Sequence, residues 1–84
     1  MDLDKLKTKA AEIDTTVRIG KNGLSESTIA EIKKQLKARK LIKIKMLNNF
    51  ISGKDKSEII DEIIQITGAI LVAKRGFVIS IYKR

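Results

Sequence analysis

Hydrophobic and polar residues alternate along the chain with two different periods, and these periods predict where helices and strands form. Residues 3–13 repeat an apolar residue every three or four positions, which is the spacing of one helix face. Residues 15–19 then change to a period of two, with Val17 and Ile19 on one face and Thr16 and Arg18 on the other. This alternation favours a short strand. We therefore expect a helix that lies on the core, followed by a strand.

A second helix and strand follow. Ser25 is a good N-cap residue for a helix over residues 26–39, and the strand Leu41 to Met46 alternates apolar residues with Lys43 and Lys45. A strand–helix–strand unit of this kind forms two parallel strands through a right-handed crossover. We expect Arg18, Lys43 and Lys45 to share one side of the sheet.

The last third of the chain predicts one helix and a hairpin. The helix begins at a capping box made by Asp55 and Glu58, ends at Gly68, and carries a wide isoleucine face that predicts deep burial. Two β-rich runs, residues 69–74 and 77–83, are joined through Arg75-Gly76, which predicts an antiparallel hairpin. Because both faces of residues 70–73 are apolar, we expect that strand inside the sheet.

Length and composition limit the class of protein. The 84 residues, 43% of them hydrophobic, fit one small domain over residues 1–84 with a modest core. Cysteine, histidine and tryptophan are all absent, which removes the commonest thiol nucleophile, general base and zinc ligands. We expect no enzyme activity, no cofactor and no metal. Acids such as Glu58, Asp61 and Glu62 are explained by the dipole of their helix.

The N-terminal residues lack a signal-peptide pattern, and no apolar run reaches the length of a membrane helix. These features predict a cytoplasmic protein without a membrane partner.

Positive charge is concentrated in one part of the chain. The formal net charge is +8, yet residues 1–32 hold six acids and five bases, so the surplus lies in residues 33–84, with 13 bases against four acids. The densest block, from Lys33 to Lys45, contains seven bases and no acid. A solvated face normally mixes both signs, so this block favours a polyanionic partner such as nucleic acid or an anionic membrane surface.

The segment between the first strand and the second helix is a candidate phosphate-binding loop. Its sequence is Gly20-Lys21-Asn22-Gly23, in which the glycines permit a tight turn and a close approach of backbone amides to a ligand. The helix that follows directs its first amides and positive dipole end toward the loop. A pair of glycines at this spacing is a weak signal alone. The basic block that follows strengthens it.

Lysines beside this loop extend the candidate site. On the second helix Lys33 and Lys37 fall next to the apolar stripe, while Lys34 lies further round and fits a solvated face equally well. On the second strand Lys43 and Lys45 share the face opposite the apolar residues. Phe50 could stack a base if it were exposed, although packing beneath its own loop explains it better.

Four segments in order resemble one known family. They are Gly20-Lys21-Asn22-Gly23-Leu24 followed by Glu31-Ile32, then Leu41-Ile42-Lys43-Ile44-Lys45, then Thr67-Gly68-Ala69, and finally Ile81-Tyr82-Lys83-Arg84. Together they resemble the CRM domain, the chloroplast RNA splicing and ribosome maturation family. The resemblance implies an α/β fold of order α-β-α-β-α-β-β, with a four-stranded mixed sheet and three helices, like the C-terminal domain of translation initiation factor three. It also implies RNA binding through the loop residues Gly20, Lys21, Asn22 and Gly23.

Stand-alone members of this family are associated with precursors of the large ribosomal subunit, and the single domain here resembles them. We therefore expect a monomer that binds structured RNA, in particular ribosomal RNA or pre-ribosomal particles, and no small-molecule substrate. The alternative is a non-specific nucleic-acid (DNA) binding module, which would share the charge asymmetry. That module would need a basic helix able to enter the major groove, whereas these lysines adjoin the core stripe.

Overall fold

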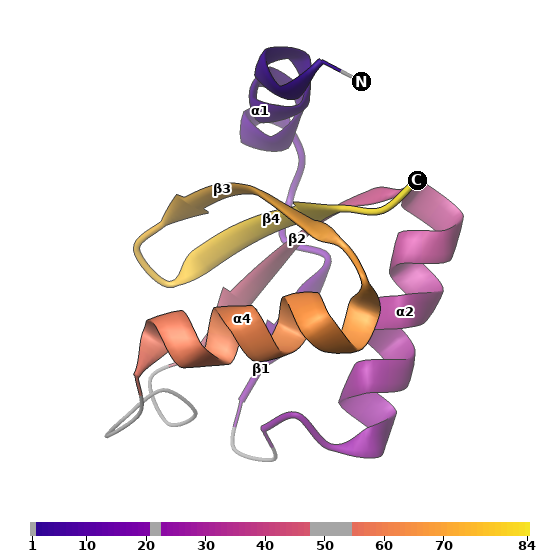
Figure 1. Cartoon of the computed structure of the whole chain (residues 1–84), viewed down its shortest axis with the longest axis vertical. Coiled ribbons are helices and arrows are strands. Elements are labelled where there is room, and N and C mark those ends of the chain that lie inside the picture. Colours follow the sequence, from indigo (N-terminus) through magenta and orange to yellow (C-terminus); the bar gives the residue numbers. More distant parts are fainter. Residues whose placement is uncertain (1, 21–22, 48–54) are drawn as a thin grey trace.

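The computed structural model describes residues 2–20, 23–47 and 55–84, and within them three helices and a four-stranded mixed sheet form one compact unit (Figure 1). The elements are, in chain order, α1 (Leu3–Glu12), β1 (Val17–Ile19), α2 (Glu26–Arg39), β2 (Leu41–Met46), α4 (Lys56–Thr67), β3 (Ile70–Arg75) and β4 (Val78–Tyr82). The strand order across the sheet is β1-β2-β4-β3. β1 and β2 are parallel, and the other two pairings are antiparallel. The predicted fold and order of elements are confirmed.

A side chain caps the start of each helix. Asp2 accepts hydrogen bonds from the backbone amides of Asp4 and Lys5 at the start of α1. Asp55 does the same for the amide of Ser57 at the start of α4, with a distance of 2.9 Å. α4 ends at Gly68, whose φ of 70° is the left-handed conformation that glycine adopts at low cost. These caps explain why the helix boundaries are readable from the sequence.

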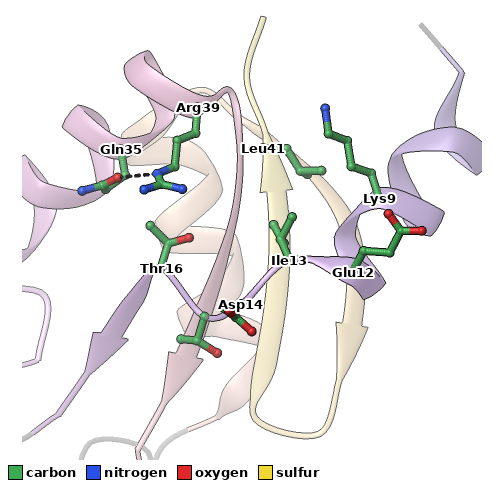
Figure 2. Close-up of a pocket in the computed structure, with 9 residues that line it drawn as sticks. Lys9, Glu12, Ile13, Asp14, Thr16, Gln35, Arg39 and Leu41 are labelled. Atoms are coloured by element: carbon green, nitrogen blue, oxygen red, sulfur yellow. Dashed lines mark hydrogen bonds between the residues drawn. The ribbon is translucent and has the colours of Figure 1, made fainter.

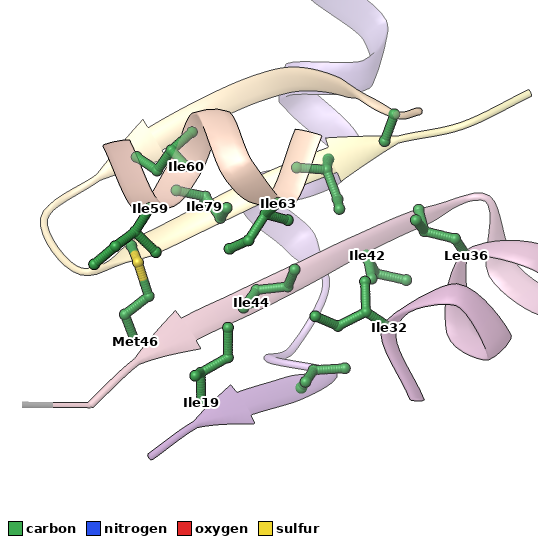
Figure 3. Packing of buried hydrophobic residues seen from close by; sticks show 13 residues of the cluster. Ile19, Ile32, Leu36, Ile42, Ile44, Met46, Ile59, Ile60, Ile63 and Ile79 are labelled. Atoms are coloured by element: carbon green, nitrogen blue, oxygen red, sulfur yellow. The ribbon is translucent and has the colours of Figure 1, made fainter. Parts of the chain in front are cut away.

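α2 and α4 cover one face of the sheet and bury the main hydrophobic core against it (Figure 3). Every second residue of the central strands β2 and β4 points into this core, as do Ile59, Ile60 and Ile63 of α4 and the apolar stripe of α2. Eight of these side chains are almost completely buried: Ile19, Ile32, Ile42, Ile44, Met46, Ile63, Ile79 and Ile81. The core therefore fixes β1 and α2, the two elements that flank the candidate loop.

α1 covers the opposite face through a second, smaller cluster in which Ala10, Leu41 and Val72 are buried. This cluster corrects one prediction. β3 was expected inside the sheet because residues 70–73 are apolar on both faces, but β3 is an edge strand. Its apolar character has a different cause, since Val72 packs beneath α1, while Ile70 and Leu71 are 39% and 40% exposed.

Within the described residues, no helix combines the length and the apolar character needed to cross a bilayer.

Candidate nucleic-acid interface

The two glycines of the candidate loop close a turn at the end of β1. The amide of Gly23 donates a hydrogen bond to the carbonyl oxygen of Gly20 at 2.9 Å, and Gly23 has a φ of 62°. A Cβ atom on Gly20 would lie 3.2 Å from the Cδ1 atom of Leu47, so the turn also rests closely on the chain that leaves β2. Gly23 is therefore favoured by its backbone conformation, and Gly20 by the lack of space for a Cβ atom. Lys21 and Asn22 lie outside the described residues.

α2 begins directly after this turn. The Ser25 hydroxyl oxygen accepts a hydrogen bond from the amide of Thr28 at 3.3 Å, and the Ser25 carbonyl accepts from the amide of Ile29 at 2.9 Å. Leu24 packs against the main core and so fixes the position of the chain just before α2. The positive end of the helix dipole is thus fixed beside the glycine turn, which is an arrangement that favours an anion.

Arg18 and Lys45 provide positive charge next to the turn. They are paired in the parallel register of β1 and β2, so their side chains leave the same face of the sheet, and both are exposed. Lys43 lies two residues earlier on that face, as the alternation predicts. It is half-buried, however, and its ammonium group donates to the carbonyl oxygen of Ile13 at 3.2 Å. Lys43 therefore has a structural partner within the protein.

Lys33 and Lys37 lie on the other side of the molecule. Both are exposed on α2, which covers the face of the sheet opposite to the one that carries Lys43 and Lys45. The sequence grouped these four lysines into one surface that continues from the loop. The structure separates them into two pairs on opposite faces, because a helix that packs on a sheet carries its own lysines away from those that leave the far face of a strand.

A cleft of about 730 Å³ lies between the end of α1 and the last turns of α2 (Figure 2). Acidic and basic side chains both line it, among them Lys9, Glu12, Asp14 and Arg39. Arg39 is held along α2 by a hydrogen bond from its Nε to the side-chain oxygen of Gln35, at 3.1 Å. Because its charges are mixed, this cavity suits a polyanion less well than the basic surfaces do.

Across residues 2–20, 23–47 and 55–84, no group of three or more carboxylates is arranged to hold a metal ion. The acids Glu58, Asp61 and Glu62 of α4 do not form such a group.

The fold agrees with the comparison to known proteins. The model of the CRS1/YhbY (CRM) domain family matches residues 2–83. The chain therefore belongs to the CRM domain family, as the resemblance predicted.

Relatives in three organisms carry names that refer to RNA. "Probable RNA-binding protein MJ0652" of Methanocaldococcus jannaschii is 36% identical over 93% of this chain, which spans 58% of that relative's length. "Probable RNA-binding protein YqeI" of Bacillus subtilis is 31% identical over 93% of the chain and 79% of its own length. An "RNA-binding protein" of Haemophilus influenzae is 35% identical, with 93% and 77% covered.

A solved structure has the same fold. The solution structure of the hypothetical protein SAV1595 from Staphylococcus aureus superposes with a TM-score of 0.78 at 36% identity, over 98% of this chain and 83% of that one.

Several basic residues that the structure places near the candidate site were not predicted to belong to it. Arg18 was expected on the face of Lys43 and Lys45 but was not included, and its register with Lys45 is the signal that would have added it. Lys40, Lys83 and Arg84 were also left out. They lie together with Lys33 and Lys37 around one cleft, although more than 40 residues separate Lys40 from Lys83 in the sequence. Two basic residues that follow a strand, such as Lys83 and Arg84, do not by themselves indicate a binding site. Only the fold shows that they lie beside the lysines of α2.

Proposed function

We propose that this chain binds structured RNA through its Gly-x-x-Gly turn, formed by Gly20, Lys21, Asn22 and Gly23, and through adjoining basic residues. The observation that supports this most directly is the glycine turn, closed by a 2.9 Å hydrogen bond and followed at once by the capped start of α2. Backbone amides and a helix dipole can there meet a phosphate without obstruction from side chains. The RNA-binding names of the relatives point in the same direction.

In this mechanism the turn and Lys21 grip a backbone phosphate, while neighbouring cations contact the phosphates on either side. The further cations in the proposal are Lys33 and Lys37 on α2 and Lys43 and Lys45 on β2, two pairs that lie on opposite faces of the sheet. Among them Lys43 contributes least, because its ammonium group is bonded to Ile13. Recognition rests on backbone shape more than on base sequence, since the chain has few aromatic residues for base stacking.

The proposed role is assistance in assembling the large ribosomal subunit, in the cytoplasm and without catalysis. It rests on the family and on the resemblance to its stand-alone members. Ribosomal RNA, or a pre-ribosomal particle that contains it, is the proposed partner of a monomeric protein.

A titration tests this function. Wild-type protein and the Lys21→Asp/Asn22→Asp variant are titrated with fragments of large-subunit ribosomal RNA and with matched duplex DNA, at two salt concentrations. The variant keeps both glycines, so the turn and the fold should persist. We expect tighter binding to RNA than to DNA, weaker binding at higher salt, and a loss of about tenfold or more in the variant, since two acids replace a cation at the phosphate site.

A different result would contradict the proposed RNA-binding function. Equal, salt-sensitive binding to RNA and duplex DNA that the variant does not change would mean that the positive charge attracts any polyanion, as the DNA-binding alternative requires.

A further inference from the structure

Five cationic side chains surround one cleft at the C-terminal end of α2. The cleft has a volume of about 280 Å³ and lies between α2, the last residue of α4 and the residues that follow β4. Its cations are Lys33, Lys37, Lys40, Lys83 and Arg84. Leu36 and Thr67, only 2% and 3% exposed, form its floor. Among the described residues that line this basic cleft there is neither an aspartate nor a glutamate.

Backbone and side-chain hydrogen bonds hold one wall of the basic cleft in position. The amide of Lys83 donates to the carbonyl oxygen of Lys40 at 2.9 Å, which ties the chain after β4 to the end of α2. The ammonium group of Lys83 donates to the carbonyl oxygen of Thr67 at 2.8 Å. The negative end of the α4 dipole thus stabilises Lys83, while no aspartate or glutamate lines the cleft beside the other four cations.

The five like charges repel one another and concentrate positive potential in the cleft, although solvent screens this repulsion because all five side chains are exposed. A polyanion that enters the basic cleft removes this repulsion and replaces the counterions that otherwise gather there. The arrangement therefore suits phosphate groups.

The basic cleft is distant from the glycine turn. α2 runs from the turn to the cleft, and the chain's C-terminal end lies beside the far end of this helix (Figure 1). From Ser25 to Lys40 the helix spans roughly 22 Å, at about 1.5 Å per residue. One phosphate cannot reach both places, so the cleft and the turn must contact different phosphates.

We propose that the basic cleft is a second phosphate-binding site, which holds the backbone of the same RNA at a point one helix length away from the glycine turn. This inference rests on the proposed RNA-binding function. It assigns RNA contacts to Lys40, Lys83 and Arg84. The length of α2 then sets the distance between the phosphate at the glycine turn and the phosphate in the basic cleft. The RNA must then extend along α2, which a short flexible oligonucleotide does less well than a folded RNA.

The test compares salt-dependent RNA affinities of a cleft variant and of a control variant on the same helix. The cleft variant is Lys40→Gly/Arg84→Gln, which leaves the Lys83 hydrogen bonds intact. The control is Lys34→Gln, which removes one lysine charge from the same helix outside the cleft. We expect the cleft variant to bind the ribosomal RNA fragment about 5- to 50-fold more weakly at low salt. We also expect it to reduce the slope of log affinity against log salt by about 1 to 2, and the control to change either quantity little.

Three outcomes bear on the inference. If the cleft variant and Lys34→Gln have equal affinity and slope while the Lys21→Asp/Asn22→Asp variant loses binding, the cleft inference is wrong and the proposed function stands. If only the cleft variant loses binding, the cleft contacts RNA phosphates, but the loop function fails, and with it the inference that α2 sets the distance between two contacts. If inorganic phosphate stabilises the wild type saturably at constant ionic strength, and the cleft variant abolishes this, the cleft belongs to a small phosphate compound and the RNA assignment is overturned.

Discussion

Lys40 is the residue at which α2 turns into β2, and its backbone has a φ of 68° and a ψ of −41°. This is the one non-glycine residue with positive φ in the part of the chain that the structure describes. A side chain in such a conformation costs of order 1–3 kcal/mol. The conformation is kept because the Lys40 amide caps the Leu36 carbonyl at 2.7 Å and its own carbonyl accepts from Lys83.

The Lys40→Gly variant should therefore be more stable than the wild type, by about 0.5–1 kcal/mol. Glycine relieves the strain, although part of the gain is lost to the larger entropy of the unfolded chain. Chemical denaturation measures the difference, with Lys40→Gln as the control that removes the charge and keeps the Cβ atom. A stability of Lys40→Gly equal to or below that of Lys40→Gln would contradict this explanation. A more stable variant that binds RNA less tightly would also exclude unfolding as the reason for weaker binding.

At the level of the elements, β2 carries two lysines, Lys43 and Lys45, that the alternation places on one face as equivalent residues. In the structure they differ in burial and in hydrogen bonding. Lys43 is half-buried beneath the chain that leaves α1 and donates to Ile13, whereas Lys45 is exposed beside Arg18. The difference arises from α1, which covers only part of this face of the sheet.

Single substitutions should separate the two roles. Lys43→Gln should lower the free energy of unfolding by about 1 kcal/mol, because it removes a partly buried hydrogen bond, and should change RNA affinity little. Lys45→Gln should leave stability within about 0.5 kcal/mol and weaken RNA binding about 5-fold, since it removes an exposed cation near the turn. Denaturation and RNA titration of both variants measure these effects. The reverse pattern would mean that Lys43 leaves Ile13 to contact RNA.

Most elements follow from local sequence signals. Ser25, Asp55 and Gly68 determine where α2 and α4 begin or end, and the predicted bounds of α2 agree with those observed. β3 shows the limit of such signals. An apolar run indicates that both faces of a strand are covered, but not whether another strand lies beside it. Here α1 covers Val72 from the second face, so an edge strand has the composition of an interior one.

At the scale of the whole molecule, the candidate site could be predicted only where its residues are close in sequence. The glycine turn and the start of α2 follow one another directly, so the sequence alone predicted that the helix begins beside the turn. Lys37 and Lys45 are only eight residues apart, yet α2 and β2 carry them on opposite sides of the sheet. Conversely, Lys40 and Lys83 are far apart in sequence and meet through a hydrogen bond between their backbones. Such placements depend on tertiary packing and not on local pattern.

RNA is proposed to contact the glycine turn and the face of α2 that ends at the basic cleft. The most direct measurement is the change of backbone amide chemical shifts when the protein is titrated with a fragment of large-subunit ribosomal RNA. We expect the largest changes at Gly20, Gly23 and the first turn of α2, with a second group at Lys37, Lys40 and Lys83. The exposed acidic side of α4, at Glu58, Asp61 and Glu62, should change little. Shifts concentrated on α1 or on that side of α4, with the turn unchanged, would contradict the proposed contact.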